Sequence, residues 1–136
     1  MSHVPARLRR FVVERAGNRC EYCLLWQTGQ EATFHVDHVL PESQGGETVA
    51  ENLALACVSC SLRKEARRTG IDPETGTRVT LFHPRDDAWA DHFRWTGFAV
   101  EGITPTGRAT IEILKLNRPS ILFIREEESG RGRFPP

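Results

Sequence analysis

Two short cysteine pairs, Cys20-Glu21-Tyr22-Cys23 and Cys57-Val58-Ser59-Cys60, decide how this chain can fold. Each pair has the spacing of a zinc knuckle, in which two thiolates bind one ion from a tight turn. The chain contains 4 cysteines, so the two pairs together supply a complete tetrahedral set of ligands. They predict a structural zinc site that joins two distant parts of the sequence.

The same cysteines allow other interpretations. A single C-x-x-C can be a redox pair, and chance can also produce this spacing. A structural disulfide needs an oxidising compartment, whereas the N-terminal residues lack the apolar core of a secretory signal. The sequence also has no apolar run as long as the roughly 20 residues of a membrane span. We therefore expect a cytoplasmic protein whose thiols stay reduced and bind zinc.

The charge balance limits the possible functions. In 136 residues, 18 Lys and Arg are offset by 18 Asp and Glu, which gives a formal net charge of zero. This composition excludes a globally basic nucleic-acid coat and a polybasic membrane binder, but it allows local basic patches. Hydrophobic residues make up 39% of the chain. They can form only a modest core, to which bound zinc would add stability.

The sequence around the cysteines predicts short helices and strands. Pro5 suits the first turn of a helix and Gly17 suits its end, so we expect a helix over residues 5–16. Periodicity and turn residues then predict three further features, namely a strand over 34–40, a short apolar run over 53–56 and a helix over 61–68.

After residue 70 the pattern changes to a turn-rich connector followed by further elements. We expect a strand over 78–82, a helix over 86–93, a strand over 94–100 and a helix from Thr104-Pro105 to about residue 116. The aromatic residues of this region are expected to form a core rather than to stack on bases; they are Trp89, Phe93, Trp95 and Phe98.

The 33 residues between the cysteine pairs carry the side chains suited to catalysis. They contain His35-Val36-Asp37-His38, then Gly45-Gly46, then Asn52-Leu53. An imidazole titrates near neutral pH and can activate water, and a carboxylate is a good ligand for a hard divalent ion.

This order of motifs closely resembles the HNH endonuclease family, over residues 20–64 or about a third of the chain. The resemblance rests on C-x-x-C, Asp-His-x-x-Pro, Gly-Gly, Asn-Leu, a second C-x-x-C and a downstream Lys. It implies an α+β fold with a ββα-metal (HNH, or His-Me finger) core and a structural zinc outside the active site. We expect an HNH domain with an N-terminal helix at 1–70, a small α/β C-terminal extension packed on it at 71–125, and a disordered tail at 126–136.

The resemblance also implies roles for individual residues. His38 would be the general base, and Asp37 would bind a catalytic divalent ion, Mg²⁺ or another. Asn52 would brace the loop and orient His38. Ser61 stands where the family usually has His or Asn as the second ligand to that ion, and a serine hydroxyl is a weaker ligand. Alternatives remain open, since Asp37 or Asn52 can simply cap a turn, and for His35 a structural role is favoured over assistance to the metal.

Two basic segments suggest where nucleic acid would bind. The region after the second cysteine pair contains Arg63, Lys64, Arg67 and Arg68 against Glu65, a net charge of +3. The N-terminal helix has the same net charge, from Arg7, Arg9, Arg10 and Arg15 against Glu14. These side chains can contact phosphates, the family's Lys position at Lys64 in particular, or they can simply be solvated.

Three functions follow in order of preference. The first is a metal-dependent HNH endonuclease that hydrolyses DNA and leaves 5′-phosphate and 3′-hydroxyl ends. The second, which Ser61 makes plausible, is a zinc-stapled nucleic-acid-binding module with weak or no catalytic activity. The third is a zinc-organised protein-interaction module whose basic helices are only solvated.

Overall fold

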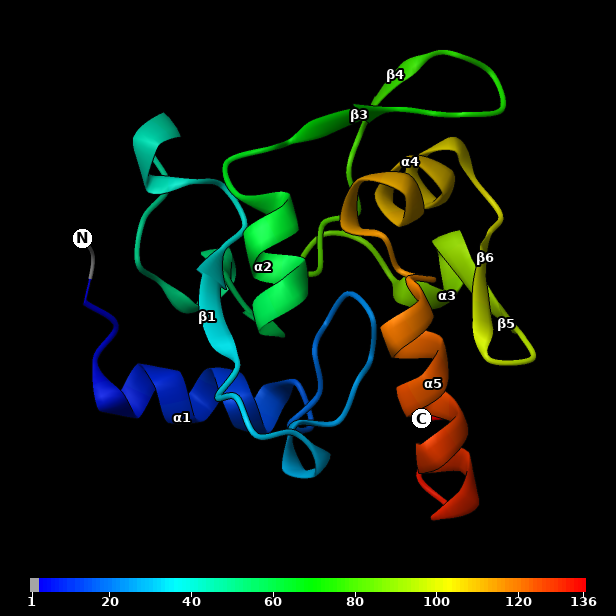
Figure 1. Ribbon diagram of the computed structural model, residues 1–136. Helices are drawn as coiled ribbons and strands as arrows, with labels where there is room; N and C mark the ends of the chain where they lie inside the picture. Colours follow the sequence, from blue (N-terminus) through cyan, green and yellow to red (C-terminus); the bar gives the residue numbers. More distant parts are fainter. Residues whose placement is uncertain (1–2) are drawn as a thin grey trace. The chain divides into compact units, whose positions relative to one another are not determined.

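The computed structural model describes residues 3–136, which form two compact units (Figure 1). Unit 1 contains the chain up to Arg68 together with the short segment His83–Asp87. Unit 2 contains Thr69–Phe82 and Ala88–Pro136. The first boundary therefore lies two residues before the expected one, and the chain returns once to unit 1.

Unit 1 begins with the expected helix, α1 (Ala6–Arg15), which confirms the prediction for this region. Pro5 precedes its first turn, and Gly17 follows in the left-handed region with φ of 63°. Val12 is fully buried on one face of α1. The helix contacts β2 (Leu53–Ala56), so this apolar face covers the centre of the unit.

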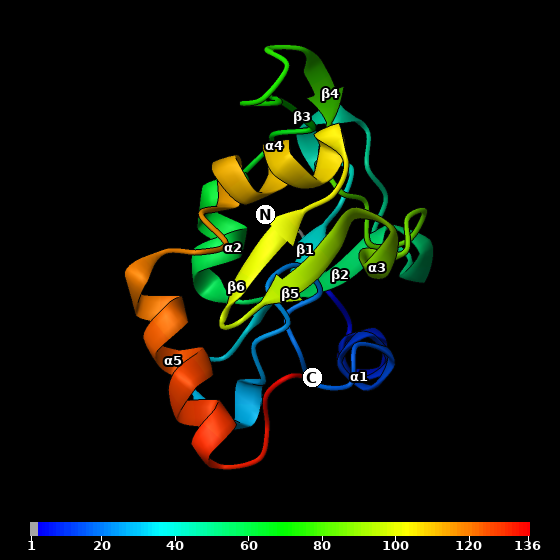
Figure 2. The ribbon, with the colours of Figure 1, turned by 90° about the vertical axis from the view of Figure 1, so that its right-hand side faces the viewer.

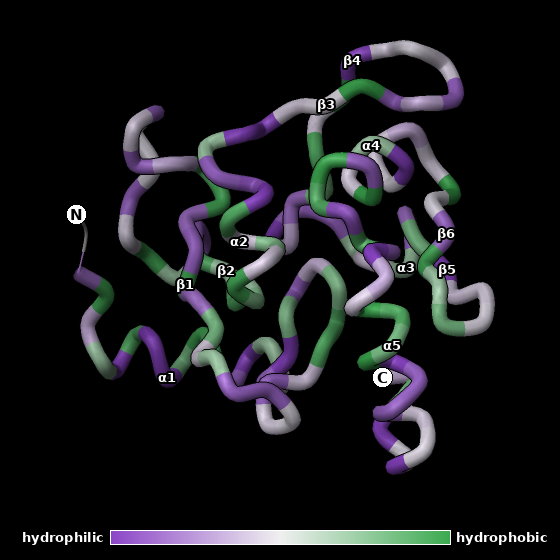
Figure 3. Tube along the Cα trace, in the orientation of Figure 1, coloured by the Kyte–Doolittle hydropathy of each residue, from purple (hydrophilic) through white to green (hydrophobic). Residues whose placement is uncertain are grey.

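The centre of unit 1 is a hairpin followed by a helix. Strand β1 (His35–His38) pairs antiparallel with β2, with His35 opposite Ala56 and His38 opposite Leu53. All four residues of β2 are buried, and Figure 3 shows β2 as hydrophobic. Helix α2 (Val58–Lys64) follows β2 and contacts both strands, which gives the expected ββα arrangement (Figure 1).

Helix α2 begins three residues earlier than the sequence predicted, and it ends four residues earlier. Cys57 caps its N-terminus, because its sulfur accepts a hydrogen bond from the Cys60 amide at 3.4 Å. Glu65 ends the helix with a φ of 48°. Arg67 and Arg68 therefore lie beyond the helix rather than on it. Three 3₁₀ turns complete the unit, at Gln27–Gly29, Glu42–Gln44 and Ala50–Asn52.

Unit 2 combines two hairpins with three helices. Strands β3 (Thr69–Ile71) and β4 (Arg78–Thr80) form one hairpin, and β5 (Phe93–Thr96) and β6 (Ala99–Gly102) form the other. Helix α4 (Pro105–Leu114) contacts β3, β4 and β6, and Figure 2 shows it beside β6. The start of α4 is as predicted, because Thr104 caps it by accepting a hydrogen bond from the Gly107 amide.

Two expectations for this unit were wrong in detail. The single strand expected over 94–100 is a hairpin, because Gly97 turns the chain with a φ of 62°. The helix expected over 86–93 is the single turn α3 (Trp89–His92).

The expected disordered tail at 126–136 is also incorrect. Helix α5 (Pro119–Gly130) continues through its first half. Ile121, Arg125 and Glu128 recur at helical spacing and are buried, and Arg133 donates two hydrogen bonds to Glu128, at 2.6 and 2.9 Å. The charged composition suggested disorder, but Glu128 and Arg133 pair with each other. No helix among residues 3–136 is long and apolar enough to cross a membrane.

Candidate metal centre and active site

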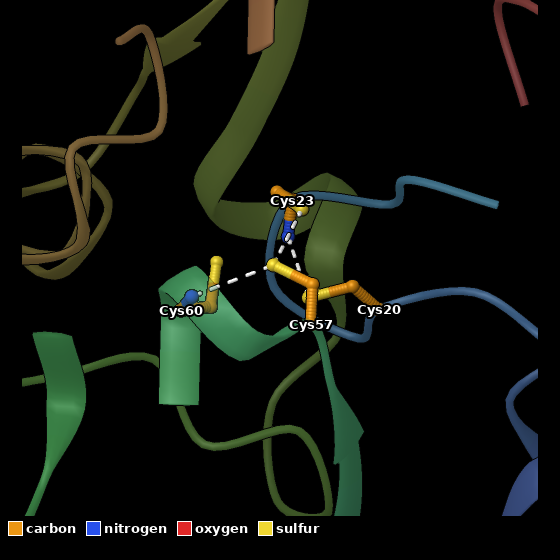
Figure 4. A group of neighbouring side chains, drawn as sticks. All are labelled: Cys20, Cys23, Cys57 and Cys60. Atoms are coloured by element: carbon orange, nitrogen blue, oxygen red, sulfur yellow. Dashed lines mark hydrogen bonds between the residues drawn. The ribbon is translucent and has the colours of Figure 1, made fainter. Parts of the chain in front are cut away.

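The four cysteines come together as the two pairs predicted. All four are buried, and their sulfurs lie within 4.8 Å of one another. The sulfurs of Cys23 and Cys57 are 3.7 Å apart, close to the roughly 3.8 Å edge of a tetrahedron with Zn–S bonds of about 2.3 Å. Figure 4 shows them converging from a loop and from the start of α2. The site therefore fits zinc.

The two cysteine pairs have the same local geometry. The amide of Cys23 donates to the sulfur of Cys20 at 3.5 Å, and the amide of Cys60 donates to the sulfur of Cys57 at 3.4 Å. Burial raises the pKa of Cys20, whereas hydrogen bonds from the other three cysteines lower the pKa of Cys57. Four buried thiolates would repel one another, so a divalent cation is needed to keep all four ionised.

Glu21 fastens the first cysteine pair to the hairpin. Its amide donates to the Leu55 carbonyl at 2.8 Å, and its carboxylate accepts the Leu55 amide at 2.8 Å. The same carboxylate forms an ion pair with Arg85. This contact explains why residues 83–87 belong to unit 1. Neither Glu21 nor Arg85 was predicted, because no local pattern links residues 64 positions apart.

His38 ends strand β1 and faces Thr48. Its Nε2 lies 2.9 Å from the Thr48 hydroxyl oxygen, and both side chains are half-buried. A threonine in this position holds the imidazole ring in one orientation. Sequence reasoning missed Thr48, whose only signal was its place in the loop between the Gly-Gly pair and Asn52.

Asn52 closes the loop that follows His38. Its Oδ1 accepts the Leu40 amide at 2.8 Å, and its Nδ2 donates to the carbonyls of Leu40 and Glu47 at 3.0 and 2.9 Å. The loop comes so close at Gly46 that a Cβ there would lie 1.7 Å from the Leu40 carbonyl oxygen. These contacts give a physical reason for both the Asn and the second Gly of the motif.

Asp37 forms an ion pair with Lys64. The distance from Oδ2 to Nζ is 3.3 Å, and the exposed fractions of the two side chains are 16% and 4%. The ammonium also donates to the carbonyls of His38 and Val39, both at 3.3 Å. Burial raises the pKa of Asp37, and the nearby ammonium opposes this shift.

The sequence had suggested that Lys64 contacts a phosphate. The structure instead commits its ammonium to Asp37 and to two backbone carbonyls. Its charged end is directed into unit 1 and is used to join α2 to β1. Asp37 Oδ2 is buried without a hydrogen bond. This oxygen already pairs with the Lys64 ammonium, so the role of Asp37 as a ligand to a catalytic ion stays a prediction.

A second contact joins the same strand and helix one turn earlier. The Nδ1 atom of His35 lies 2.9 Å from the hydroxyl oxygen of Ser61, and His35 is exposed. Among residues 3–136, only the four cysteines form a group of three or more His, Cys, Asp or Glu side chains able to hold an ion. Any ion at Asp37 thus has fewer than three such protein ligands.

The predicted basic residues fall into two groups. Arg63, Arg67 and Arg68 are exposed near the C-terminal end of α2, although Arg63 Nε also donates to the Ser59 hydroxyl at 3.2 Å. On α1, Arg15 is used structurally, since it donates to the carbonyls of Ala50 and Leu53. The other three arginines of this helix, Arg7, Arg9 and Arg10, are exposed as Arg15 is, and none of them has such a carbonyl contact among the hydrogen bonds of residues 3–136.

Comparison with known proteins agrees with this arrangement. Residues 20–67 match the family described as HNH endonuclease. The chain is 23% identical over 109 residues to the Septu protein PtuB of Bacillus thuringiensis. That alignment covers 79% of this chain and 40% of PtuB, so the chain spans less than half the length of this relative. No solved structure gives a significant match. The ββα segment and the four clustered cysteines therefore lie within the stretch that matches the HNH endonuclease family.

Proposed function

We propose that this protein is a metal-dependent endonuclease that hydrolyses phosphodiester bonds in DNA. The observation that carries the proposal is the pairing of Asp37 and His38 at the end of β1, beside α2 and a loop closed by Asn52. A carboxylate and an imidazole on consecutive strand residues can address a bound cation and an activated water from opposite faces.

His38 is the proposed general base. Water attacks the phosphorus and passes its proton to the imidazole, and the bond from phosphorus to the 3′ oxygen breaks. The departing 3′ oxygen takes a proton from solvent water, which leaves 5′-phosphate and 3′-hydroxyl ends. In the tautomer that donates Nε2–H to Thr48, the basic lone pair is on Nδ1. Thr48 positions this base through its contact with the imidazole ring. Asn52 does so through its hydrogen bond to Leu40, in the loop that follows His38.

Asp37 is the proposed ligand to the catalytic ion. A divalent cation bound there, Mg²⁺ or another, would supply positive charge beside the phosphate and its departing oxygen. Lys64 holds the Asp37 carboxylate against α2 through its contact with Oδ2. The zinc proposed at the four cysteines has a structural role. It needs reduced thiols, and the cytoplasm is a compartment that keeps thiols reduced.

The exposed arginines are the proposed DNA contacts. Arg63, Arg67 and Arg68 lie at the end of α2, and α1 presents three more arginines on its surface. With a net charge of zero over the chain, binding rests on these local groups and should weaken steeply with salt.

A DNA-binding module that has lost turnover is the second candidate. Two observations favour it: the Lys64 ammonium already pairs with Asp37, and the Ser61 hydroxyl already contacts His35. Both contacts use groups that would otherwise attract the catalytic ion.

A nicking assay separates the two candidates. Supercoiled plasmid is incubated with the zinc-loaded protein and either Mg²⁺ or Mn²⁺, beside His38→Ala and the control His3→Ala at an exposed histidine. Loss of a general base should reduce the nicking rate by roughly 10²- to 10⁴-fold, and the control should match the wild type. Equal nicking by His38→Ala would eliminate His38 as the base. DNA binding without nicking by the wild type would favour the second candidate.

A further inference from the structure

The exposed histidine His35 has a contact that a purely structural role does not explain. Its Nδ1 lies 2.9 Å from the hydroxyl of Ser61, at the position where the HNH family usually supplies a metal ligand. A histidine with a structural role is normally buried with its partners, whereas His35 is exposed at the start of β1.

His35 and Asp37 lie on the same face of β1, because side chains two residues apart in a strand share a face. Both side chains contact the same helix, through Ser61 and Lys64 respectively. The two side chains therefore approach the surface of α2 together, one helical turn apart.

A histidine that binds a metal ion through one ring nitrogen usually donates the N–H of the other to an oxygen, which fixes the tautomer and the ring orientation. We propose that His35 binds the catalytic ion together with Asp37, through Nε2, and that Ser61 orients the ring through Nδ1 rather than binding the ion. This inference rests on the proposed ion at Asp37.

Ser61 alone would be a poor replacement for the usual ligand. A neutral hydroxyl on a short side chain donates weakly to a divalent ion, and this hydroxyl already contacts His35. The carboxylate of Asp37 has a second oxygen, Oδ1, besides the one that Lys64 contacts. An imidazole nitrogen and a carboxylate oxygen from the same strand face then give two protein ligands without any donor from position 61.

The proposed ligands predict which ion the site selects. Mg²⁺ prefers oxygen ligands, whereas an imidazole nitrogen favours ions later in the first transition series. We therefore expect the site to bind Mn²⁺ and Co²⁺ more tightly than Mg²⁺, with the nitrogen of His35 as the cause.

Pulsed electron paramagnetic resonance of Mn²⁺ tests the inference directly. The full chain, loaded with zinc, is titrated with Mn²⁺ in the absence of DNA, and nitrogen coupling to the bound ion is recorded. We expect coupling from one imidazole in the wild type, its loss in His35→Ala, and its retention in the exposed-site control His3→Ala and in His38→Ala.

Both variants should weaken the binding of Mn²⁺, so the nitrogen coupling and the ion preference in the same titration separate His35 from Ser61. His35→Ala should weaken Mn²⁺ binding at least tenfold and reduce the preference for Mn²⁺ over Mg²⁺. Ser61→Ala should keep the nitrogen coupling and weaken binding by roughly 10- to 100-fold, as loss of an orienting group does.

Several results would overturn the inference. These are nitrogen coupling that persists in His35→Ala, wild-type Mn²⁺ affinity in that variant, coupling that disappears only in His38→Ala, or no Mn²⁺ bound at millimolar concentration. Because the measurement uses no DNA, coupling from His35 in a protein that does not nick plasmid would refute the nuclease and leave the metal site standing. Nicking by a protein without such coupling would support the nuclease and refute His35 as a metal ligand.

Discussion

The two units of this protein are stabilised by different means. Unit 1 has one two-stranded hairpin, and the four cysteine sulfurs lie within its buried core. Unit 2 has an aromatic cluster in place of a metal site, in which the ring centroids of Phe82 and Phe93 are 5.4 Å apart and those of Trp89 and Trp95 are 5.1 Å apart. A small unit with long loops needs a cross-link, whereas large rings bury enough apolar surface without one.

The two units also differ in the contacts made by a buried carboxylate. Both oxygens of Asp72 in unit 2 accept hydrogen bonds from Arg108, at 2.9 and 3.0 Å, and the arginine lowers the pKa of Asp72. In unit 1, Oδ2 of Asp37 lies 3.3 Å from the Lys64 ammonium without the geometry of a hydrogen bond, and burial raises the pKa of Asp37. The fully satisfied carboxylate stabilises the fold, and the incompletely satisfied one lies at the candidate active site.

Removal of zinc should give the largest difference between the units. Structural zinc supplies about 10–16 kcal/mol in zinc-finger peptides, as much as the whole stability of a small domain. We therefore expect a strong chelator to unfold unit 1 in the full chain, so that the amides of β2 lose hydrogen-exchange protection while those of α4 keep it.

Two controls make the chelator experiment specific. Addition of zinc should restore protection of β2, and Cys57→Ser should show the loss without chelator. Equal loss of protection in both units would mean that unit 2 also depends on the metal, and the contrast drawn between the units would be wrong.

Acid should destabilise unit 2 through Asp72. Because Arg108 lowers the pKa of Asp72 in the folded state, the unfolded chain binds a proton at higher pH than the folded chain does. The stabilisation is complete above the unfolded pKa of about 3.9 and is lost as the pH falls toward the folded pKa.

The variant Asp72→Asn should therefore unfold at a lower temperature at pH 7 and lose less stability than the wild type between pH 5 and pH 3. Fluorescence of Trp89 and Trp95 in a Trp26→Phe background reports on unit 2. Asp91→Asn, at an exposed aspartate of the same unit, should behave like the parent protein. Parallel curves for Asp72→Asn and the parent would show that this ion pair contributes nothing to the pH dependence.

The C-terminal residues should contribute the smallest effect. The ring of Phe134 packs against Trp95 and Phe98, with centroid distances of 4.8 and 5.7 Å. Loss of these aromatic contacts in Phe134→Ala should lower the free energy of unfolding of unit 2 by about 1 kcal/mol. Urea unfolding measures it, with Arg131→Ala at an exposed position as the control. No change would mean that the last residues do not pack stably.

Local patterns predicted much of unit 1 and less of unit 2. The helix α1, the strand β1 and the cap of α4 follow from Pro, Gly, Thr and periodicity, which act over a few residues. The second half of helix α5 was missed because its charges, including the buried Glu128, look like those of a disordered tail until their partners are known. The return of residues 83–87 to unit 1 depends on an ion pair between distant residues.

The sequence by itself determined the candidate metal centre and the resemblance to the HNH family, because cysteine spacing and the order of motifs are properties of the chain. Only the tertiary structure decided where the polar side chains of the site are directed. Because β1 and α2 pack against each other, Lys64 reaches Asp37 at 3.3 Å and Ser61 reaches His35 at 2.9 Å. Partners across two elements depend on packing, which no spacing along the chain encodes.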